Sequence, residues 1–396
     1  MDALLFRDIA VFDGIRSLGT TSVLVAGGRI AAVGDGLPAP PGARIVPGAG
    51  RTLLPGLTDA HVHVSPGALA RGLRFGVTTQ LDMFADPAVL ATARAEAAGR
   101  PDVSDLRSAG TGATAPGGHP SQLVHTGLFG PFPTVGSARD ADAFVAARAA
   151  EGSDYLKVFA SSIPGEPDLP TLDAETVAAL VAAAHRHGLL AVAHATDVRS
   201  AVTAAQAGAD GLAHLPFDRQ LTGGFVAEMA RHGTFVIPTL TMLESFCQHR
   251  GGADLACDPR VATRLDAAAR EGLCQVMSPP AAAGYAVDNA LAGVPALLAA
   301  GVDVLAGTDA GAPGTTHGAS LHRELELLVA AGMRPEQALA AATSVPARRM
   351  GMADRGRIAR GLRADLLVVR GDPVTDITST RDIVMVCWEG RPAPRV

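Results

Sequence analysis

The middle of this 396-residue chain alternates short β-rich runs with alanine-rich stretches of helical character. Several of the helical stretches end in glycine, which is typical of a helix C-terminal cap. Eight strands that alternate with helices favour a (β/α)₈ TIM barrel of the α/β class, whose chemistry lies at the C-terminal strand ends. An open, doubly wound sheet is the alternative fold. The strand-like runs cover residues 56–64, 77–82, 105–109, 155–159, 190–194, 211–214, 234–238 and 304–309.

Both ends of the chain are also β-rich, but without the alternating helices. We predict that the two ends meet and form one small β-sandwich domain of residues 1–55 and 352–396. The barrel then comprises residues 56–351. Two unrelated β caps are the alternative. The strand-like runs at the ends are 9–12, 22–26, 29–33, 365–369 and 383–388.

The composition narrows the class of protein. Hydrophobic residues make up 48% and charged residues 18% of the chain, as in globular proteins. The formal net charge is −6 and no basic block occurs, which disfavours nucleic acid and anionic membranes as partners. The cysteines form no CxxC pair, and the first residues lack a secretory signal pattern. We therefore expect a cytoplasmic protein; a homo-oligomer is left open.

Lys157 is the only lysine among the 33 lysine and arginine residues. It lies in the apolar run 155–159, which predicts a buried strand. The planar guanidinium group of arginine stays protonated, whereas a buried lysine amine can lose its proton and react. A lysine retained here therefore indicates a role that arginine cannot perform. The alternative is that Lys157 is present by chance and that its amine reaches solvent from the end of the strand.

Two histidines end the first strand of the predicted barrel, in the sequence His61-Val62-His63. Strand side chains alternate between faces, so both imidazoles face the barrel interior while Val62 packs outward. Two imidazoles at this spacing can bind one metal ion. The pattern is common by chance, and a pair of hydrogen-bonded core histidines is the alternative.

Further polar residues end four later strands of the predicted barrel. Because these ends meet at one face of a barrel, we expect the residues to join the histidine pair. Each of them alone is equally well explained as a hydrogen-bonded strand end, but the set favours a metal centre. The residues are Lys157, His194, His214 and Asp309.

A protonated lysine beside a metal ion would repel it, and a neutral lysine binds only one metal. If the amine of Lys157 adds CO₂, the resulting carbamate can bridge two metal ions. Two such ions can share a hydroxide and stabilise both the attacking and the leaving side of a displacement. Asp309 would then take the proton of that hydroxide and return it to the leaving group.

Taken together, these residues resemble the amidohydrolase superfamily, and most closely its imidazolonepropionase-like and prolidase-like branch. The resemblance covers nearly the whole chain. It is carried by the motif PGLTDAHVH at residues 55–63, the run GLRADLLVV at 361–369, Lys157, His194, His214 and Asp309.

The resemblance implies a site for two divalent metal ions, which are usually zinc in this family. By this likeness one metal is held by His61, His63 and Asp309. The other is held by His194 and His214, and carboxylated Lys157 bridges the two.

The sequence also departs from close members of the branch. Lys157 argues against imidazolonepropionase itself, which resembles a one-metal enzyme. Residues 194–197 lack the HxxE pattern of nucleobase deaminases, and residues 213–218 differ from the IEHG-like form of many prolidase relatives. The last difference puts a dipeptide specificity in doubt and leaves the metal role of His214 intact.

Three loops are expected to shape the pocket of a small-molecule substrate, at residues 110–136, 239–258 and 311–317. The first is unusually long and rich in glycine and proline, which is typical of a functional loop. His322 follows no pattern and is expected at the surface. The candidate substrate contacts are His119, His125, Arg199 and His317.

The leading interpretation is a binuclear metal-dependent hydrolase that cleaves an amide-type bond by a metal-bridging hydroxide. The bond belongs to a peptide, an N-acyl compound, a cyclic amide or a carbamate. A lactone or ester hydrolase with the same site is the alternative within hydrolases. A Schiff-base aldolase would use Lys157 but leave four histidines without a role. A non-enzymatic scaffold would have lost ligands, and none is missing.

Overall fold

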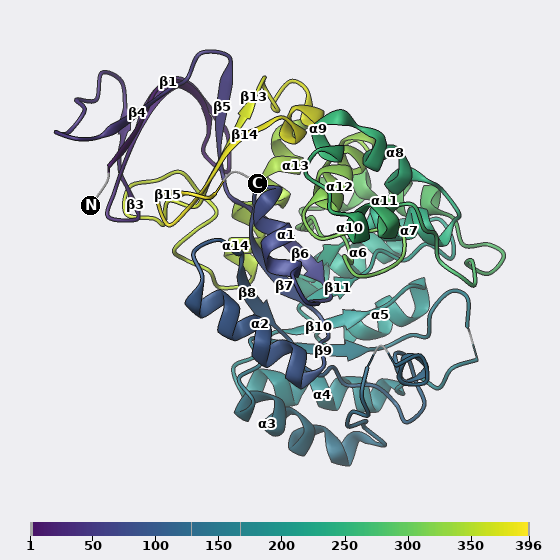
Figure 1. Ribbon diagram of the computed structural model, residues 1–396. Coiled ribbons are helices and arrows are strands. Elements are labelled where there is room, and N and C mark those ends of the chain that lie inside the picture. Colours follow the sequence, from purple (N-terminus) through teal and green to yellow (C-terminus); the bar gives the residue numbers. More distant parts are fainter. Residues whose placement is uncertain (1–2, 128, 167, 395–396) are drawn as a thin grey trace.

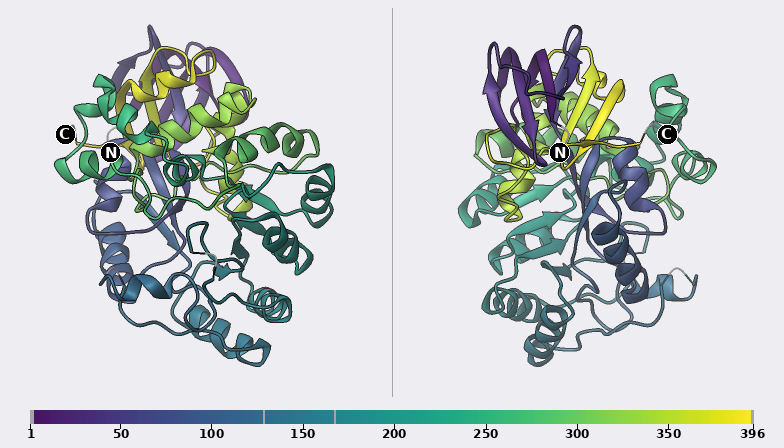
Figure 2. Two further views of the ribbon diagram at one scale, coloured as in Figure 1. Left: turned by 90° about the vertical axis from the view of Figure 1, so that its right-hand side faces the viewer. Right: turned by 60° about the vertical axis from the view of Figure 1, so that its left-hand side comes forward.

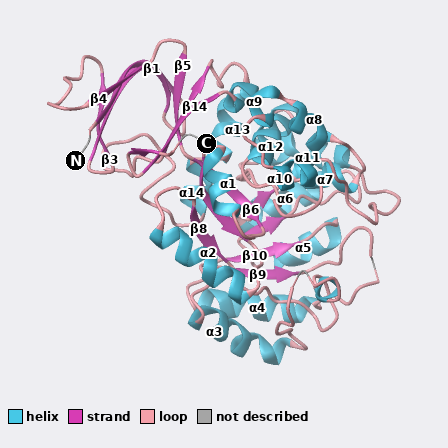
Figure 3. Ribbon diagram, viewed as in Figure 1, coloured by secondary structure: helices cyan, strands magenta, loops and turns pink. Residues whose placement is uncertain are grey.

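The computed structural model describes residues 3–127, 129–166 and 168–394 (Figure 1). Helices surround a central group of parallel strands, and a separate sheet lies at one end of the molecule (Figure 3). Within the described residues, no helix combines the length and the apolar character needed to cross a membrane.

The central strands form two parallel groups, with the orders β6-β7-β8 and β12-β11-β10-β9. Their bounds are β6 Leu57–Val62, β7 Val77–Asp82, β8 Asp105–Ser108, β9 Leu156–Phe159, β10 Ala191–His194, β11 Gly211–Ala213 and β12 Phe235–Ile237. Single parallel bridges join the groups into a ring, from Ala113 to Val158, from Val236 to Val304 and from Val62 to Ala310. This closed ring and the helices around it confirm the predicted TIM barrel.

The eighth position of the ring is held by backbone hydrogen bonds rather than by a continuous strand ladder. Leu305 N donates to Val236 O on one side at 2.8 Å, and Asp309 N donates to His61 O on the other at 2.8 Å. Asp309 has a left-handed φ of 57°, which ends the extended conformation there. The predicted strand 304–309 therefore occupies its place in the barrel with a sharp turn at its functional end.

Helices on the outside of the barrel connect most of its strands. Helix α7 and helix α8 lie within residues 239–258, which were predicted as a loop. The helices are α1 Ala68–Arg74, α2 Pro87–Gly99, α3 Ala141–Ala150, α4 Ala174–Arg186, α5 Val198–Gln206, α6 Gly223–His232, α7 Leu240–Phe246, α8 Gly251–Cys257, α9 Pro259–Ala262, α10 Ala267–Leu273, α11 Val287–Ala299, α12 Ala319–Ala330, α13 Pro335–Ala341 and α14 Ser344–Arg349, with short 3₁₀ turns at Ser121–Val124, Ala138–Asp140 and Ile377–Arg381.

The two ends of the chain share one mixed sheet, as predicted. Its order is β15-β14-β13-β5-β1-β2-β3, with β4 paired to β1. In the right-hand view of Figure 2 the purple N-terminal and yellow C-terminal strands lie side by side. The strands are β1 Leu4–Phe12, β2 Ser17–Ala26, β3 Arg29–Gly34, β4 Arg44–Pro47, β5 Arg51–Pro55, β13 Leu366–Arg370, β14 Ile383–Trp388 and β15 Arg391–Pro392.

The strands β5 and β13 separate two hydrophobic cores. Leu53 and Leu366 pack into the core of the sheet domain, whereas Leu54 and Leu367 pack into the main core of the barrel. This is the alternation expected of neighbouring strand residues. The sheet is therefore fixed to the barrel through buried side chains on one of its faces.

The chain passes from β5 into β6 through Gly56. A Cβ atom at this position would lie 2.3 Å from Thr78 Oγ1, so a larger residue does not fit. Gly56 N also donates to Asp365 O at 2.8 Å, next to the start of β13. The strand that carries the first two histidines is thus positioned by contacts from both ends of the chain.

Candidate metal centre

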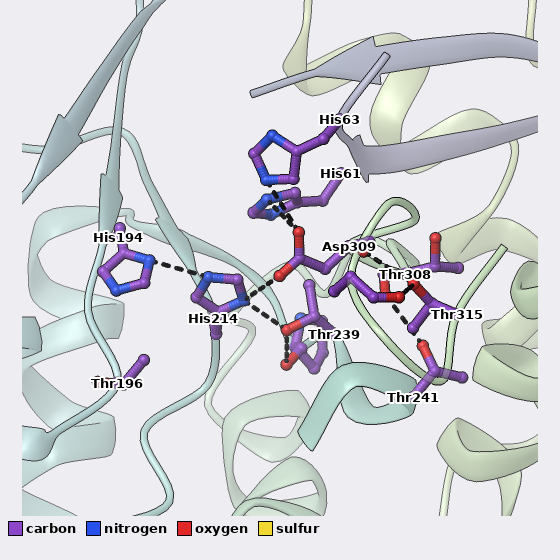
Figure 4. Close-up of polar contacts among 12 residues, drawn as sticks. His61, His63, His194, Thr196, His214, Thr239, Thr241, Thr308, Asp309 and Thr315 are labelled. Carbon is purple, nitrogen blue, oxygen red and sulfur yellow. Dashed lines mark hydrogen bonds and ion pairs between the residues drawn. The ribbon is translucent and has the colours of Figure 1, made fainter. Parts of the chain in front are cut away.

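Strand β6 brings His61 and His63 to the carboxylate of Asp309. His61 Nε2 lies 3.3 Å and His63 Nε2 lies 3.0 Å from Asp309 Oδ1. His63 Nδ1 lies 3.0 Å from Phe84 O, a pure acceptor, so Nδ1 is the donor and Nε2 faces the carboxylate. Figure 4 shows both rings on the same side of Asp309. The alternation predicted from the sequence therefore brings both imidazoles to one carboxylate.

His214 and His194 approach Asp309 from the neighbouring strands. His214 Nδ1 lies 4.0 Å from Asp309 Oδ2, and His194 Nδ1 lies 3.0 Å from His214 Nε2 (Figure 4). Four imidazoles and one carboxylate from β6, β10, the end of β11 and the eighth barrel position therefore meet in one place.

Thr239 fixes the orientation of the His214 ring. Its hydroxyl donates to Pro238 O at 2.8 Å, so its oxygen accepts from His214 Nδ1 at 2.6 Å. This contact assigns the proton of the neutral ring to Nδ1 and leaves the lone pair on Nε2. This lone pair, which faces His194 Nδ1 at 3.0 Å, is the one that a metal ion would use on the oriented ring.

Asp59 ties together the two segments that carry His61 and Asp309. Its carboxylate accepts from Thr308 N at 3.0 Å, from Thr308 Oγ1 at 2.7 Å and from His61 N at 3.2 Å. Burial raises the pKa of Asp59 to about 7, although these hydrogen bonds oppose the rise. The spacing of the two facing segments is thus set by a fully buried carboxyl group.

The buried polar atoms of this group fit a metal ion. Neither ring nitrogen of His61 has a hydrogen-bond partner among the described residues, although the residue is fully buried. Ligand atoms of His61, His214 and Asp309 lie within 4.8 Å of one another. Buried polar groups without partners cost about 1–3 kcal/mol each, and a bound cation would remove that cost here.

The protonation states of three of the four rings also suit metal binding; in the fourth, His63, burial lowers the pKa but the hydrogen bond to Asp309 outweighs it and raises this pKa. Burial lowers the pKa of His61 and of His194 well below the usual value and lowers the pKa of His214 to about 3. These rings are therefore neutral at pH 7, as metal ligands must be. Burial raises the pKa of Asp309, but neighbouring His61 and His63 outweigh it and hold this pKa well below its usual value. Asp309 is therefore an anion.

Lys157 points from β9 toward the same group of side chains. It is 1% exposed, and its amine has no hydrogen-bond partner in the described part of the chain. Burial lowers the pKa of Lys157 to about 7, so a large fraction of the amine is neutral at pH 7. A Cβ atom at Gly112 would lie 2.8 Å from Phe159 and 3.2 Å from the Lys157 side chain, so glycine leaves space for both.

These side chains line a cavity of about 300 Å³, which is large enough for a small organic molecule. His119, from the long loop 110–136, also lines it, and its ring centroid lies 5.2 Å from that of His194. Gln122 Nε2 donates to His119 Nδ1 at 2.8 Å, which leaves the proton on Nε2. Burial lowers the pKa of His119 to about 3, so this ring is a neutral donor.

The other candidate substrate contacts lie outside the cavity lining. His125 and Arg199 are exposed on a loop and on helix α5. His317 is buried beside β7, where its Nδ1 contacts Gln80 Oε1 at 2.8 Å. His322 was expected at the surface but is fully buried, because its ring bonds to Thr380 Oγ1 and Phe75 O. Of the four candidates, only His119 enters the proposed site.

Several residues of the site follow no recognisable motif in the sequence. Thr239 orients His214 from a position that only the folded chain brings near. Phe84 and Phe129 line the cavity, yet a phenylalanine in a loop carries no motif. The segments 163–166 and 277–279 also contribute to the lining and were not among the three predicted loops.

Comparisons with known proteins agree with this geometry. The model of the amidohydrolase family matches residues 52–392. A Xaa-Pro dipeptidase with methionine bound in its active site is similar in structure, with a TM-score of 0.79, 21% identity and 99% of each chain covered. An amidohydrolase is similar with a TM-score of 0.77, 25% identity and 98% of each chain covered.

A prolidase complexed with N-methylphosphonate-L-proline is similar with a TM-score of 0.78, 22% identity and 100% of each chain covered. A search of curated proteins found no match. The chain therefore belongs to the amidohydrolase family, and the resemblance stated from the sequence is confirmed. It is a metal-dependent hydrolase that acts on carbon–nitrogen bonds.

Proposed function

We propose that this protein is a binuclear hydrolase that cleaves an amide-type bond in a small molecule, with two zinc ions held at the barrel mouth. One observation carries the proposal: four imidazoles, an anionic carboxylate and a buried, unpaired lysine amine converge on one cavity. A group with these ligand types and this burial suits divalent cations that prefer nitrogen and oxygen donors.

The assignment of ligands follows the positions of the side chains. His61, His63 and Asp309 would hold one ion, because both histidine Nε2 atoms face the same carboxylate oxygen. His194 and His214 would hold the other, because their rings adjoin on neighbouring strands.

Lys157 would bridge the two ions as a carbamate, formed when its neutral amine adds CO₂ and releases one N–H proton to solvent. The partly neutral amine supports this step, since only the unprotonated form adds CO₂. When bound, the metal ions would lower the pKa of the attacking water and polarise the scissile carbonyl.

The side chains of the protein then move the protons. Asp309 accepts the proton of the attacking water as the bond to the carbonyl carbon forms. It returns this proton to the nitrogen of the leaving amine as the C–N bond breaks. His119 donates a hydrogen bond from Nε2 to the substrate, and Gln122 holds its ring in that orientation.

The test begins with the metal content of the purified protein after growth with zinc. We expect about two divalent ions per chain, as in two-metal hydrolases, and hydrolysis of at least one class among dipeptides, N-acyl amines, cyclic amides and carbamates. His61→Ala should lose metal and activity. His187→Ala, which changes an exposed histidine on the same chain, should lose neither. Absence of bound metal in the wild type, or full activity of His61→Ala, would contradict the proposal.

Two further assays on the wild-type protein distinguish amide hydrolysis from ester hydrolysis and from Schiff-base chemistry. Hydrolysis of lactones but of no amide would assign the site to ester cleavage. Covalent trapping of a carbonyl substrate on Lys157 by borohydride would instead indicate a Schiff base.

A further inference from the structure

An aromatic wall adjoins the proposed metal ligands. The ring centroids of Phe84 and Phe129 lie 4.9 Å apart, and those of Phe84 and Phe159 lie 5.9 Å apart, all in edge-to-face contact. Phe159 also lies 5.4 Å from the His194 ring. The wall thus begins directly beside the reacting centre and continues along the cavity.

Other parts of the lining are apolar as well. Helix α7 contributes Met242 and Phe246, and Met277 follows from the loop after α10. Four of the 12 phenylalanines of the chain therefore line this one cavity. Flexible thioethers beside rigid rings accept apolar groups of varied outline.

Outside the proposed metal group, the described lining of the cavity carries a negative side chain and no positive one. Among the described residues of the lining, Lys157 is the only lysine or arginine, and it belongs to the proposed metal group. The one charged side chain outside that group is Glu166. Its carboxylate forms no ion pair with any described residue and is not fully buried. Away from the proposed metal group, a substrate carboxylate would therefore meet the like charge of Glu166 and no guanidinium or ammonium to pair with.

The ligands named for two of the similar structures are carboxylates. Methionine and N-methylphosphonate-L-proline, bound by two of those proteins, each carry a free carboxylate. In this chain the exposed Arg199 does not reach the lining, and His119 is neutral. Apart from Lys157, no described residue of the lining is a lysine or arginine.

We infer that the substrate is a carboxylate-free amide or carbamate that carries an aryl or similarly apolar group, rather than a dipeptide or an N-acyl amino acid. The inference rests on the proposed function and adds to it the substrate class. The aromatic wall binds the apolar group, and Glu166 excludes free carboxylates.

Two compounds that differ only by a carboxylate test this inference. N-acetyl-2-phenylethylamine and N-acetyl-L-phenylalanine have the same acyl group, the same phenyl group and the same type of scissile bond. We expect the zinc-loaded wild type to favour the first at least tenfold in kcat/KM. Equal or better kcat/KM for N-acetyl-L-phenylalanine would overturn the inference.

Two variants examine the cause of the preference. Glu166→Gln should lower the ratio of the two kcat/KM values at least threefold, whereas Glu175→Gln, which changes an exposed glutamate on α4, should not. Leu123→Arg places a cation in the lining and should raise kcat/KM for N-acetyl-L-phenylalanine. An unchanged ratio in both Glu166→Gln and Leu123→Arg would show that charge does not select the substrate.

Calorimetric titration measures the binding affinity of both compounds and does not depend on turnover. If neither compound nor any other amide is hydrolysed, the proposed function fails. Tighter binding of N-acetyl-2-phenylethylamine would still support the carboxylate-free class. Tighter binding of N-acetyl-L-phenylalanine would refute it, whether or not hydrolysis occurs.

Discussion

Replacing Lys157 by methionine should have opposite effects on the metal-free and the metal-loaded protein. Methionine keeps an unbranched side chain of similar length and removes the amine. In the metal-free protein this amine is 1% exposed and has no hydrogen-bond partner among the described residues. Its removal should therefore stabilise the metal-free fold.

The magnitude follows from the pKa of Lys157. Burial lowers this pKa from 10.5 to about 7, which at about 1.4 kcal/mol per pH unit corresponds to a folding cost of up to about 5 kcal/mol near neutral pH. The substitution should recover most of that cost. Leu156→Met, at the neighbouring buried position of β9, is the matched control and should change stability by less than about 1.5 kcal/mol.

The stability difference between the metal-free wild type and Lys157→Met should depend on pH. Between pH 7 and pH 10.5 the unfolded chain binds a proton at Lys157 that the folded chain does not. The stability of the metal-free wild type should therefore rise with pH across this window, relative to Lys157→Met, by up to about 1.4 kcal/mol per pH unit. Urea unfolding of the chelated proteins in CO₂-depleted buffer at several pH values measures this difference.

The metal-loaded protein should respond in the opposite direction. Without the bridging group, Lys157→Met should bind at least one metal ion fewer per chain and lose activity. Metal analysis after dialysis against zinc measures the first, and amide hydrolysis the second. A metal-free variant no more stable than the wild type at pH 7 would refute the burial argument. Unchanged metal content would refute the bridging role.

Three further changes address the rest of the site. Asp309→Asn should lower kcat about 10²–10⁴-fold with the fold retained by circular dichroism, because the amide cannot accept the proton of water; near-normal turnover would rule out this role. Thr239→Val removes the bond to His214 Nδ1 and should weaken metal binding about 10–100-fold in a chelator competition; unchanged affinity would mean that the ring needs no such support. Gly112→Ala should cost about 1–3 kcal/mol in urea unfolding, because its Cβ would lie 2.8 Å from Phe159, and an unaffected midpoint would contradict the close packing.

The barrel and the group at its mouth could be predicted because both follow from local patterns. Alternation along β6 turns His61 and His63 to the same side, and a parallel barrel brings strand ends together wherever they lie in the sequence. The single lysine also stood out against an otherwise arginine-only background. These rules need no knowledge of how the loops fold.

All three loops predicted to shape the pocket contribute to its lining. The side-chain contacts within the pocket could not be predicted, because they join distant parts of the chain. Phe84 and Phe129 come together across a loop of irregular structure, and no periodicity marks that contact. His322 is buried because it bonds to Phe75 O, 247 residues away in the sequence. The exposure of Arg199 likewise depends on which face of α5 packs against the barrel.

The pairing of β5 with β13 determines the order in which the molecule can assemble on the ribosome. Leu54 on β5 lies opposite Leu367 on β13, so β5 keeps one unpaired edge until residues 366–370 have been synthesised. All strands and helices of the barrel precede β13 in the sequence and are therefore synthesised before it. Contacts this distant in sequence form slowly, and a free strand edge invites pairing with other chains. Translation that stalls before residue 366 should therefore yield nascent chains prone to aggregate through β5, even when their barrels are intact.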